Sequence, residues 1–210
     1  GIAIIQLDDG KANAVGHTLV DAVNAGLDQA LSDADAVVIA GRPGLFSAGF
    51  DLKEFENGPE ATQALVNKGA QLLLRCFSHP QPMVAACTGH AVATGALLLL
   101  AADNRLGAAG DFRLGLNETA IGMSLPEFGL QLAAARLSKR HHTQAVVQSE
   151  LFDPESAVDA GFLDQVCPPE SLLEQAIELA ERLAQLPSDA YAKNKKGSRR
   201  QYIDAIAASL

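Results

Sequence analysis

The sequence has few cysteines and no long apolar run. Cys76, Cys87 and Cys167 are widely spaced and form no C-x-x-C pair. This spacing argues against a disulfide scaffold or a cysteine metal site, and it predicts buried, reduced thiols in a cytoplasmic protein. The most apolar segment, residues 91–102, is too short to cross a membrane and is followed directly by charged residues. No association with a membrane is therefore expected.

Positive charge is also scarce. The formal net charge of −9 at pH 7 argues against general binding to nucleic acid or to anionic membrane surfaces. The first five residues read as a strand and lack the basic region of a signal peptide. Basic residues gather only between Lys193 and Arg200. Two interpretations of this basic segment remain open: a solvated helix face, or a patch that contacts the phosphates of a ligand.

Several common catalytic motifs are absent as well. Gly44 and Gly49 have the outer spacing of a phosphate-binding loop, but Phe50 and Asp51 follow in place of lysine and serine. No G-x-G-x-x-G, G-x-S-x-G or H-E-x-x-H motif occurs. A metal enzyme or a nucleotide enzyme is therefore disfavoured, and no bound metal is expected.

Short apolar runs alternate with segments of helical periodicity, which predicts an α/β fold. Beyond Leu125 the strand signal almost vanishes. We therefore predict an α/β core over residues 1–150 and a helical region over residues 151–210 that packs on the core or on a neighbouring subunit. The expected strands are 3–7, 36–40, 82–87 and 162–166, and the expected helices are 17–31, 61–77, 96–102, 130–149, 154–160, 169–186 and 190–210.

Two loops are rich in glycine and alanine. One spans residues 41–55 after a predicted strand, and the other spans residues 89–96 and leads into a short apolar helix. Small residues let a ligand approach the main chain closely, and the first turn of a helix offers unpaired N–H groups. Two such loops that meet would give two N–H donors to a developing negative oxygen, as in an oxyanion hole. Tight packing of glycine and alanine is the competing interpretation.

Three segments follow one another along the chain: G-K-A-N-A at residues 10–14, F-S-A-G-F-D-L-K at residues 46–53 and T-G-H-A-V-A-T-G at residues 88–95. In order and separation they resemble the signatures of the crotonase (enoyl-CoA hydratase/isomerase) superfamily, and the likeness runs over nearly the whole chain. The resemblance implies a spiral of ββα turns with a helical C-terminal trimerisation region, assembled as a homotrimer or a dimer of trimers. It also implies an acyl-CoA substrate, whose enolate is stabilised by two main-chain N–H groups.

By position in these signatures, the resemblance implies that the two donors are the amides of Phe50 and Thr94. In relatives the second donor usually lies in a G-G-G run, whereas this chain has Ala93-Thr94-Gly95. Because the donor is a backbone group, a threonine side chain leaves it in place.

The same resemblance places coenzyme A along the first two signatures. Ala48 matches the position whose main chain meets the adenine, Lys53 matches a position that approaches the phosphates, and Lys11 and Ala12 lie near the CoA-binding edge. For Lys53, a solvated lysine is the competing interpretation. Coenzyme A enters as part of the substrate thioester, so no separate cofactor is implied.

The reaction depends on which carboxylates the site holds. Hydratases use two glutamates, and the resemblance puts the first at Leu97, whose side chain cannot transfer a proton. The second position is Glu118, within the run L-N-E-T-A-I-G at residues 116–122, which is similar to the stretch around the single catalytic glutamate of Δ3,Δ2-enoyl-CoA isomerases. One carboxylate can move a proton from C2 to C4 while two amides hold the dienolate. We therefore expect an isomerase of fatty-acid degradation.

Two alternatives remain open. The same oxyanion hole could serve residual hydration or another enolate reaction, such as thioester hydrolysis or decarboxylation. The substituted Ala93-Thr94-Gly95 run also fits an acyl-CoA-binding protein of crotonase fold without turnover.

Overall fold

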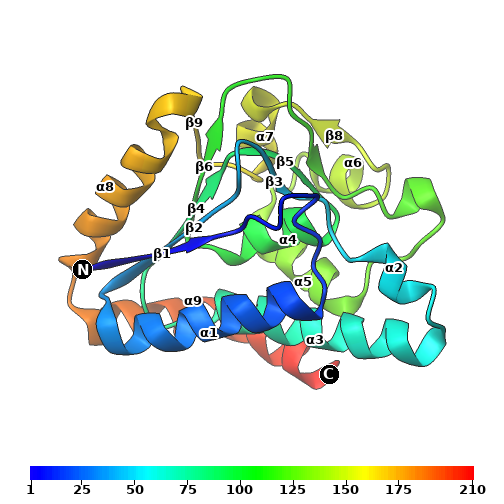
Figure 1. Ribbon diagram of the computed structural model, residues 1–210, viewed down its shortest axis with the longest axis horizontal. Coiled ribbons are helices and arrows are strands. Elements are labelled where there is room, and N and C mark those ends of the chain that lie inside the picture. Colours follow the sequence, from blue (N-terminus) through cyan, green and yellow to red (C-terminus); the bar gives the residue numbers. More distant parts are fainter.

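The computed structural model describes residues 1–210 and contains nine strands and nine α-helices (Figure 1). Its central part repeats one unit, in which two strands are followed by a helix. The first unit is β2 (Ala36–Ala40), β3 (Gly44–Ser47) and α3 (Pro59–Phe77), the second is β4 (Met83–Cys87), β5 (Gly89–Val92) and α4 (Thr94–Ala101), and the third is β6 (Asn104–Ala108), β7 (Leu114–Gly115) and α5 (Glu127–Arg136). The chain is thus a spiral of ββα turns, as expected.

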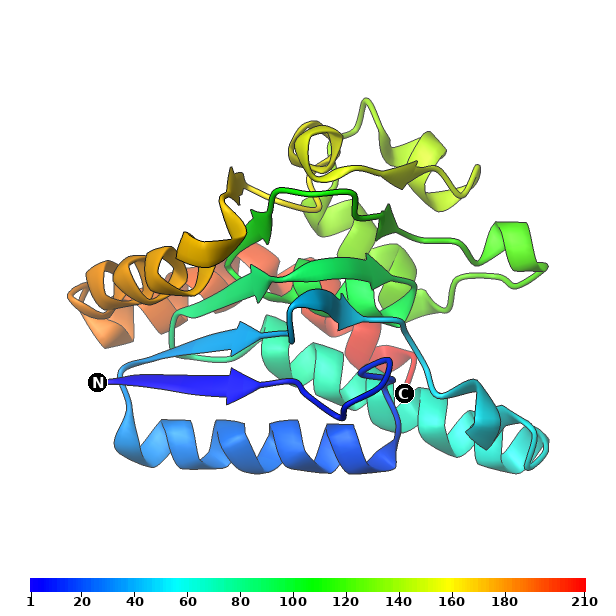
Figure 2. The same cartoon turned by 45° about the horizontal axis from the view of Figure 1, so that its top comes forward.

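Each turn of the spiral gives one strand to each of two sheets. The larger sheet has the order β1-β2-β4-β6-β9 and is parallel throughout, and the smaller has the order β3-β5-β7-β8. In the smaller sheet only the β7–β8 pair is antiparallel. Figure 2 shows the strands of successive turns stacked and pointing in one direction. The remaining strands are β1 (Ile2–Gln6), β8 (Leu151–Phe152) and β9 (Gln165–Cys167).

Helices cover both faces of the larger sheet. Val37 and Ile39 of β2 pack in the main core with α1 (His17–Asp33) and α3, whereas Val38 packs on the other face with α8 (Leu172–Ala184). Every residue of β2 is therefore buried. A strand that is buried on both faces reads as a continuous apolar run, which is why this strand was recognisable in the sequence.

Residues 151–210 are joined closely to the rest of the fold. They supply β8 and β9 to the two sheets, α8 to one face of the larger sheet, and α9 (Ser188–Ala208), which packs against α5 and α3 (Figure 1). The short α7 (Pro154–Ala160) coincides with its predicted range. None of the helices combines the length and apolarity that a membrane crossing requires.

Three expectations about secondary structure were wrong. The helix predicted over residues 130–149 is two helices, α5 and α6 (His142–Val146), because Leu137 is extended (φ −79°, ψ 149°) and Ser138 N donates to Ala160 O instead of continuing the helix. The first glycine-rich loop contains β3 and the short α2 (Leu52–Phe55), and the second contains β5. Strands β6, β7 and β8 were not predicted, and the strand predicted over residues 162–166 is the shorter and later β9.

Candidate active site

The predicted donors and the predicted acid lie after neighbouring strands of the smaller sheet. Phe50 follows β3, Thr94 follows β5, and Glu118 follows β7. These strands are adjacent and parallel in the order β3-β5-β7. Since the carboxyl ends of parallel strands meet at one edge of a sheet, the three residues are brought to the same edge although they are far apart in the sequence.

The turn that carries Phe50 leaves its amide free. Val15 N donates to Gly49 O at 2.7 Å, and Asp51 N donates to Val15 O at 3.1 Å. The carbonyl of Gly49 and the N–H of Asp51 both point toward Val15, so the N–H of Phe50, which lies between them, points away from Val15. The N–H of Phe50 has no acceptor within the chain. The ring of Phe50 lies against α3 at Gly69, where an added Cβ would stand only 2.5 Å from the ring.

The turn that carries Thr94 is anchored through Ala93. Ala93 N donates to Gly115 O at 2.9 Å, and Ala93 O accepts from Leu97 N at 3.1 Å. In a trans peptide the N–H is directed opposite to the preceding C=O, so these bonds turn the N–H of Thr94 away from the body of α4. That N–H has no acceptor within the chain. It lies at the positive end of the helix dipole, which favours negative charge there.

The two donor turns touch each other. An added Cβ at Gly49, where φ is +94°, would stand 3.0 Å from Ala93 Cβ and 3.5 Å from Thr94 N. An added Cβ at Gly95 would stand 2.3 Å from Ser47 O. The structure therefore brings the two predicted loops together. The competing interpretation, in which the glycines serve tight packing, is also correct, because a side chain at Gly49 or Gly95 would keep the two turns apart.

Ala93 has a strained backbone. Its φ of 52° and ψ of −128° lie in a region that glycine adopts readily and alanine does not. Such a conformation costs about 1–3 kcal/mol. Each of the two hydrogen bonds that hold Ala93 contributes about 0.5–1.5 kcal/mol, so the bonds and the strain are of similar size.

Glu118 is a buried acid without a partner. The residue is 7% exposed, and its Oε2 is buried and makes no hydrogen bond. Removal from water disfavours the charged carboxylate, and this burial raises the pKa of Glu118 above its ordinary value. A raised pKa brings a carboxyl group closer to the range in which it can accept and return a proton near neutral pH.

Leu97, which the family resemblance places at the position of the first hydratase glutamate, is part of the core. It is 1% exposed and lies beside Gly129 of α5, where an added Cβ would stand 3.3 Å from Leu97 Cδ1 and 3.0 Å from Leu125 Cδ2. No carboxylate is present at this position. Phe50, Thr94 and Glu118 do not line the cavity of about 520 Å³ that lies beside Asp103.

Three of the four residues predicted to bind coenzyme A lie together. Ala48 N donates to Ala12 O at 3.1 Å, and Arg42 Nε donates to Lys11 O at 3.0 Å. The side chains of Lys11, Ala12 and Ala48 are exposed. Lys53 lies apart in α2, where its N–H donates to Asp51 Oδ1 at 3.1 Å, and its exposed side chain makes no ion pair. The structure thus offers an open, small-residue surface beside the Phe50 turn.

Asn13 has a role that the sequence analysis did not assign. It is 0% exposed with φ of 47°, and its Nδ2 donates to Leu7 O at 2.8 Å and Phe46 O at 3.1 Å. Ser47 Oγ donates back to Asn13 O at 2.8 Å. Asparagine tolerates the left-handed conformation better than most residues. Asn13 therefore connects the G-K-A-N-A segment to β3 by hydrogen bonds. In the sequence, the only indication of this role was the place of Asn13 in that motif.

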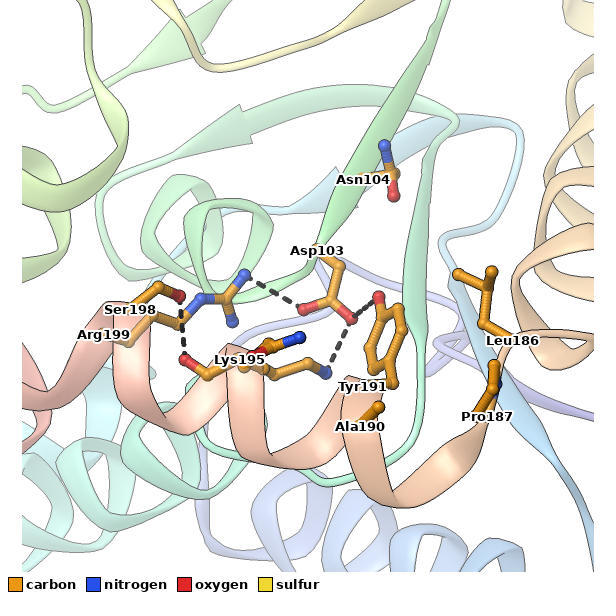
Figure 3. Close-up of a pocket in the computed structure, with 10 residues that line it drawn as sticks. Asp103, Asn104, Leu186, Pro187, Ala190, Tyr191, Lys195, Ser198 and Arg199 are labelled. Atoms are coloured by element: carbon orange, nitrogen blue, oxygen red, sulfur yellow. Dashed lines mark hydrogen bonds and ion pairs between the residues drawn. The ribbon is translucent and has the colours of Figure 1, made fainter.

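The basic segment 193–200 is only in part the solvated helix face that was one of its two interpretations. Figure 3 shows Lys195 and Arg199 of α9 directed at Asp103, beside a cavity of about 520 Å³. Lys195 Nζ lies 2.6 Å from Asp103 Oδ2 and also donates to His79 O and Gln81 O. The side chains of Lys195 and Arg199 are therefore paired with Asp103 inside the fold. Only their neighbours Lys193, Lys196 and Arg200 remain exposed.

Comparison with known proteins gives the same family as the motifs. The enoyl-CoA hydratase/isomerase family matches residues 1–210, the whole chain. The chain belongs to this family. Enoyl-CoA hydratase/isomerase folds match it closely, which confirms the predicted crotonase-like architecture.

Individual relatives of the family carry both names. A structure of an enoyl-CoA hydratase/isomerase family protein from Pseudomonas syringae has 44% identity and a TM-score of 0.97, over 100% of this chain and 91% of that one. The apo enoyl-CoA isomerase of Mycobacterium tuberculosis has 40% identity and a TM-score of 0.94, over 99% of this chain and 91% of that one. A probable enoyl-CoA hydratase of Bacillus subtilis is 31% identical over 190 residues, which are 88% of this chain and 73% of the relative.

Proposed function

We propose that this family member is a Δ3,Δ2-enoyl-CoA isomerase whose single acid–base residue is Glu118. The observation that carries the proposal is the contrast between two positions. Glu118 is a buried carboxyl group with an unpartnered oxygen, whereas Leu97, where a hydratase has its other glutamate, is a core leucine. The relative from Mycobacterium tuberculosis is named an isomerase in one structure and a probable hydratase in another, so the proposal rests on the contrast between these two positions.

The proposed reaction moves one proton and keeps all atoms of the substrate. The carboxylate of Glu118 removes a proton from C2 of the 3-enoyl thioester, and the electron pair shifts onto the thioester oxygen to give a dienolate. The amide N–H groups of Phe50 and Thr94 donate to this oxygen, where they are worth most because negative charge develops there. The protonated Glu118 then returns the proton to C4. Leu97 contributes an apolar surface instead of a carboxylate that could hold an attacking water.

The coenzyme A moiety is proposed to lie along the first two signatures. The exposed Ala12 and Ala48 leave room for the adenine beside their main chain, and Lys11 and Lys53 are available for phosphate oxygens. No cofactor other than the coenzyme A of the substrate is needed for this chemistry. We propose a homotrimer or a dimer of trimers as the assembly, which sedimentation of the purified protein distinguishes from a monomer.

The proposed role of Glu118 is tested with the variant Glu118→Gln, which keeps the size of the side chain and removes the base. We expect at least about 10²-fold slower conversion of 3-enoyl-CoA to the 2-trans isomer, measured by chromatography of the products. Glu127→Gln is the matched control, because Glu127 is an exposed carboxylate on the nearby start of α5, and its loss should leave the rate unchanged. Equal rates for wild type and Glu118→Gln would refute the assignment.

Hydration is the second candidate, because the relative from Bacillus subtilis is named a probable hydratase. The same incubation with 2-enoyl-CoA separates the two reactions, since hydration yields a 3-hydroxyacyl thioester and isomerisation does not. Hydrolysis and decarboxylation would release free coenzyme A or carbon dioxide. Acyl-CoA binding with no product from any thioester would instead identify a protein that only binds.

A further inference from the structure

The turn that carries Glu118 has few contacts of its own to hold it in place. Residues 119–124 are all exposed, and the amides of residues 121–123 donate only to carbonyl oxygens of residues 117–119. Figure 2 shows this green segment projecting at the right from the body of the fold. Main-chain hydrogen bonds therefore do not fix the turn relative to the two sheets, although Glu118 at its start is buried.

One side chain from elsewhere in the sequence holds the turn. Ala120 N donates to Ser149 Oγ at 2.9 Å, and this is the one hydrogen bond that joins residues 117–124 to another part of the chain. The smaller sheet sets this partner. Strands β7 and β8 are antiparallel with Gly115 opposite Leu151, so the chain two positions before Leu151, at Ser149, lies beside the chain two positions after Gly115. The Ser149 hydroxyl therefore connects the turn to the sheet.

Ser149 has a backbone conformation that suits glycine better than serine. Its φ is +55°, in the left-handed region that L-residues other than asparagine and aspartate rarely adopt. Glycine would adopt this conformation without strain, but it would offer no acceptor to Ala120 N. The serine side chain thus has a cost in backbone energy, and the hydrogen bond to the turn is what its hydroxyl contributes.

We propose that Ser149 is a positioning residue for Glu118, because its hydroxyl holds the turn on which the acid is carried. The proposed reaction requires one carboxyl group to take a proton from C2 and to return it at C4, so Glu118 must keep its place through both transfers. Small displacements of a reacting group lower the rate steeply. This inference rests on the proposed function, in which Glu118 is the base.

Two substitutions of Ser149 separate the hydroxyl from the backbone. Ser149→Gly removes the acceptor and relieves the positive φ, so we expect kcat for 3-enoyl-CoA to fall about tenfold, with less than about a twofold change in KM and a thermal midpoint near that of wild type. Ser149→Thr keeps the hydroxyl and adds a β-branch, which a positive φ tolerates poorly, so we expect a lower thermal midpoint and a kcat within about twofold of wild type. A merely structural role would instead make kcat follow the thermal midpoint.

Gln148→Gly is the control for a loosened connection, because Gln148 is the exposed neighbour of Ser149 between α6 and β8. The substitution makes the same connection more flexible and leaves the hydroxyl in place. Its kcat should therefore equal that of wild type, even if its thermal midpoint is lower.

The place of Glu118 is also measured without substrate, by NMR titration of its carboxyl carbon in protein that contains isotope-labelled glutamate. The resonance that is missing from Glu118→Gln identifies the residue. Burial raises the pKa of Glu118 in the wild type. In Ser149→Gly water reaches the loosened carboxyl group, so we expect its pKa to fall toward the ordinary value of glutamate. Ser149→Thr and Gln148→Gly should both keep the wild-type pKa.

An unchanged kcat or an unchanged pKa of Glu118 in Ser149→Gly would overturn the inference, and so would a kcat that falls equally in Ser149→Gly and Ser149→Thr. A wild type without isomerase activity would refute the proposed function. The NMR titration would then still decide whether Ser149 positions Glu118, because it needs no turnover.

Discussion

Two buried carboxyl groups of this chain have opposite surroundings. The side chain of Asp103 is 7% exposed and is met by Lys195 Nζ at 2.6 Å, Tyr191 OH at 2.7 Å and Arg199 Nη2 at 3.0 Å (Figure 3). Glu118 is buried as a whole residue, yet its Oε2 has no hydrogen-bond partner. Burial thus accompanies a compensated charge in one place and an uncompensated acid in the other.

The difference shows how a fold separates stability from reactivity. A carboxylate surrounded by cations and donors is held in one protonation state and one place, and it ties α9 to the start of β6. A carboxyl group with a free oxygen has a cost in stability and keeps its capacity to exchange a proton. Perturbed acids of the second kind are the ones to expect at active sites, whereas those of the first kind belong to the scaffold.

The largest effect on stability is expected for Asp103→Asn. The neutral amide leaves Lys195 and Arg199 buried without their counter-ion, which should cost about 3–5 kcal/mol of the free energy of unfolding. Urea titration followed by circular dichroism measures the loss. The isomerase rate per folded molecule should be unaffected. A loss below about 1 kcal/mol would mean that Asp103 is no more a structural centre than Glu118.

A smaller loss is expected for Lys195→Met. Asp103 keeps Tyr191 and Arg199, but His79 O and Gln81 O lose the donor that they share. Buried acceptors without a donor cost about 1–3 kcal/mol. Lys196→Met is the matched control, since Lys196 is the exposed neighbour and such surface changes stay within about 0.5 kcal/mol. Similar effects of the two substitutions in urea titration would contradict the structural role of Lys195.

The smallest effect, and one of opposite sign, is expected for the stability of Glu118→Gln. Burial raises the pKa of Glu118 in the folded state. The folded protein therefore keeps its full stability at low pH, where Glu118 is neutral, and loses part of it as the pH rises through the folded-state pKa. Above it the wild type holds an ionised, unpartnered carboxylate. The variant should therefore equal the wild type near pH 4 and become more stable above neutral pH, as followed by thermal midpoints. A variant that is less stable at high pH would show that Glu118 is structural.

The sequence was sufficient for the features that depend on local pattern. The apolar run of β2, the helix over residues 154–160 and the three signatures were predicted from the sequence and indicated the architecture. Asp153 caps α7 by accepting from Ser156 N, a signal that sequence reasoning reads well.

Features that depend on distant partners were out of reach. The two residues of β7 form a strand through their pairing with β5 on one side and with β8 on the other. Lys195 and Arg199 look like surface cations until the fold sets them against Asp103, which lies far away in the sequence. The strain at Ala93 likewise arises from Gly115 and Leu97, which bind its two polar groups. No local pattern encodes these pairings.

The distribution of the site over successive turns has a consequence for how the protein gains its activity. One proposed donor follows β3, the other follows β5, and the proposed acid follows β7, so each turn of the spiral contributes one component of the proposed site. A fragment that stops before β7 would hold both proposed donor amides and no base, and one that starts at β4 would hold the proposed base and only one of the two donors. Because these strand pairings connect distant parts of the chain, they form slowly relative to local helices. The proposed catalytic groups are therefore assembled only when β7 has paired with β5.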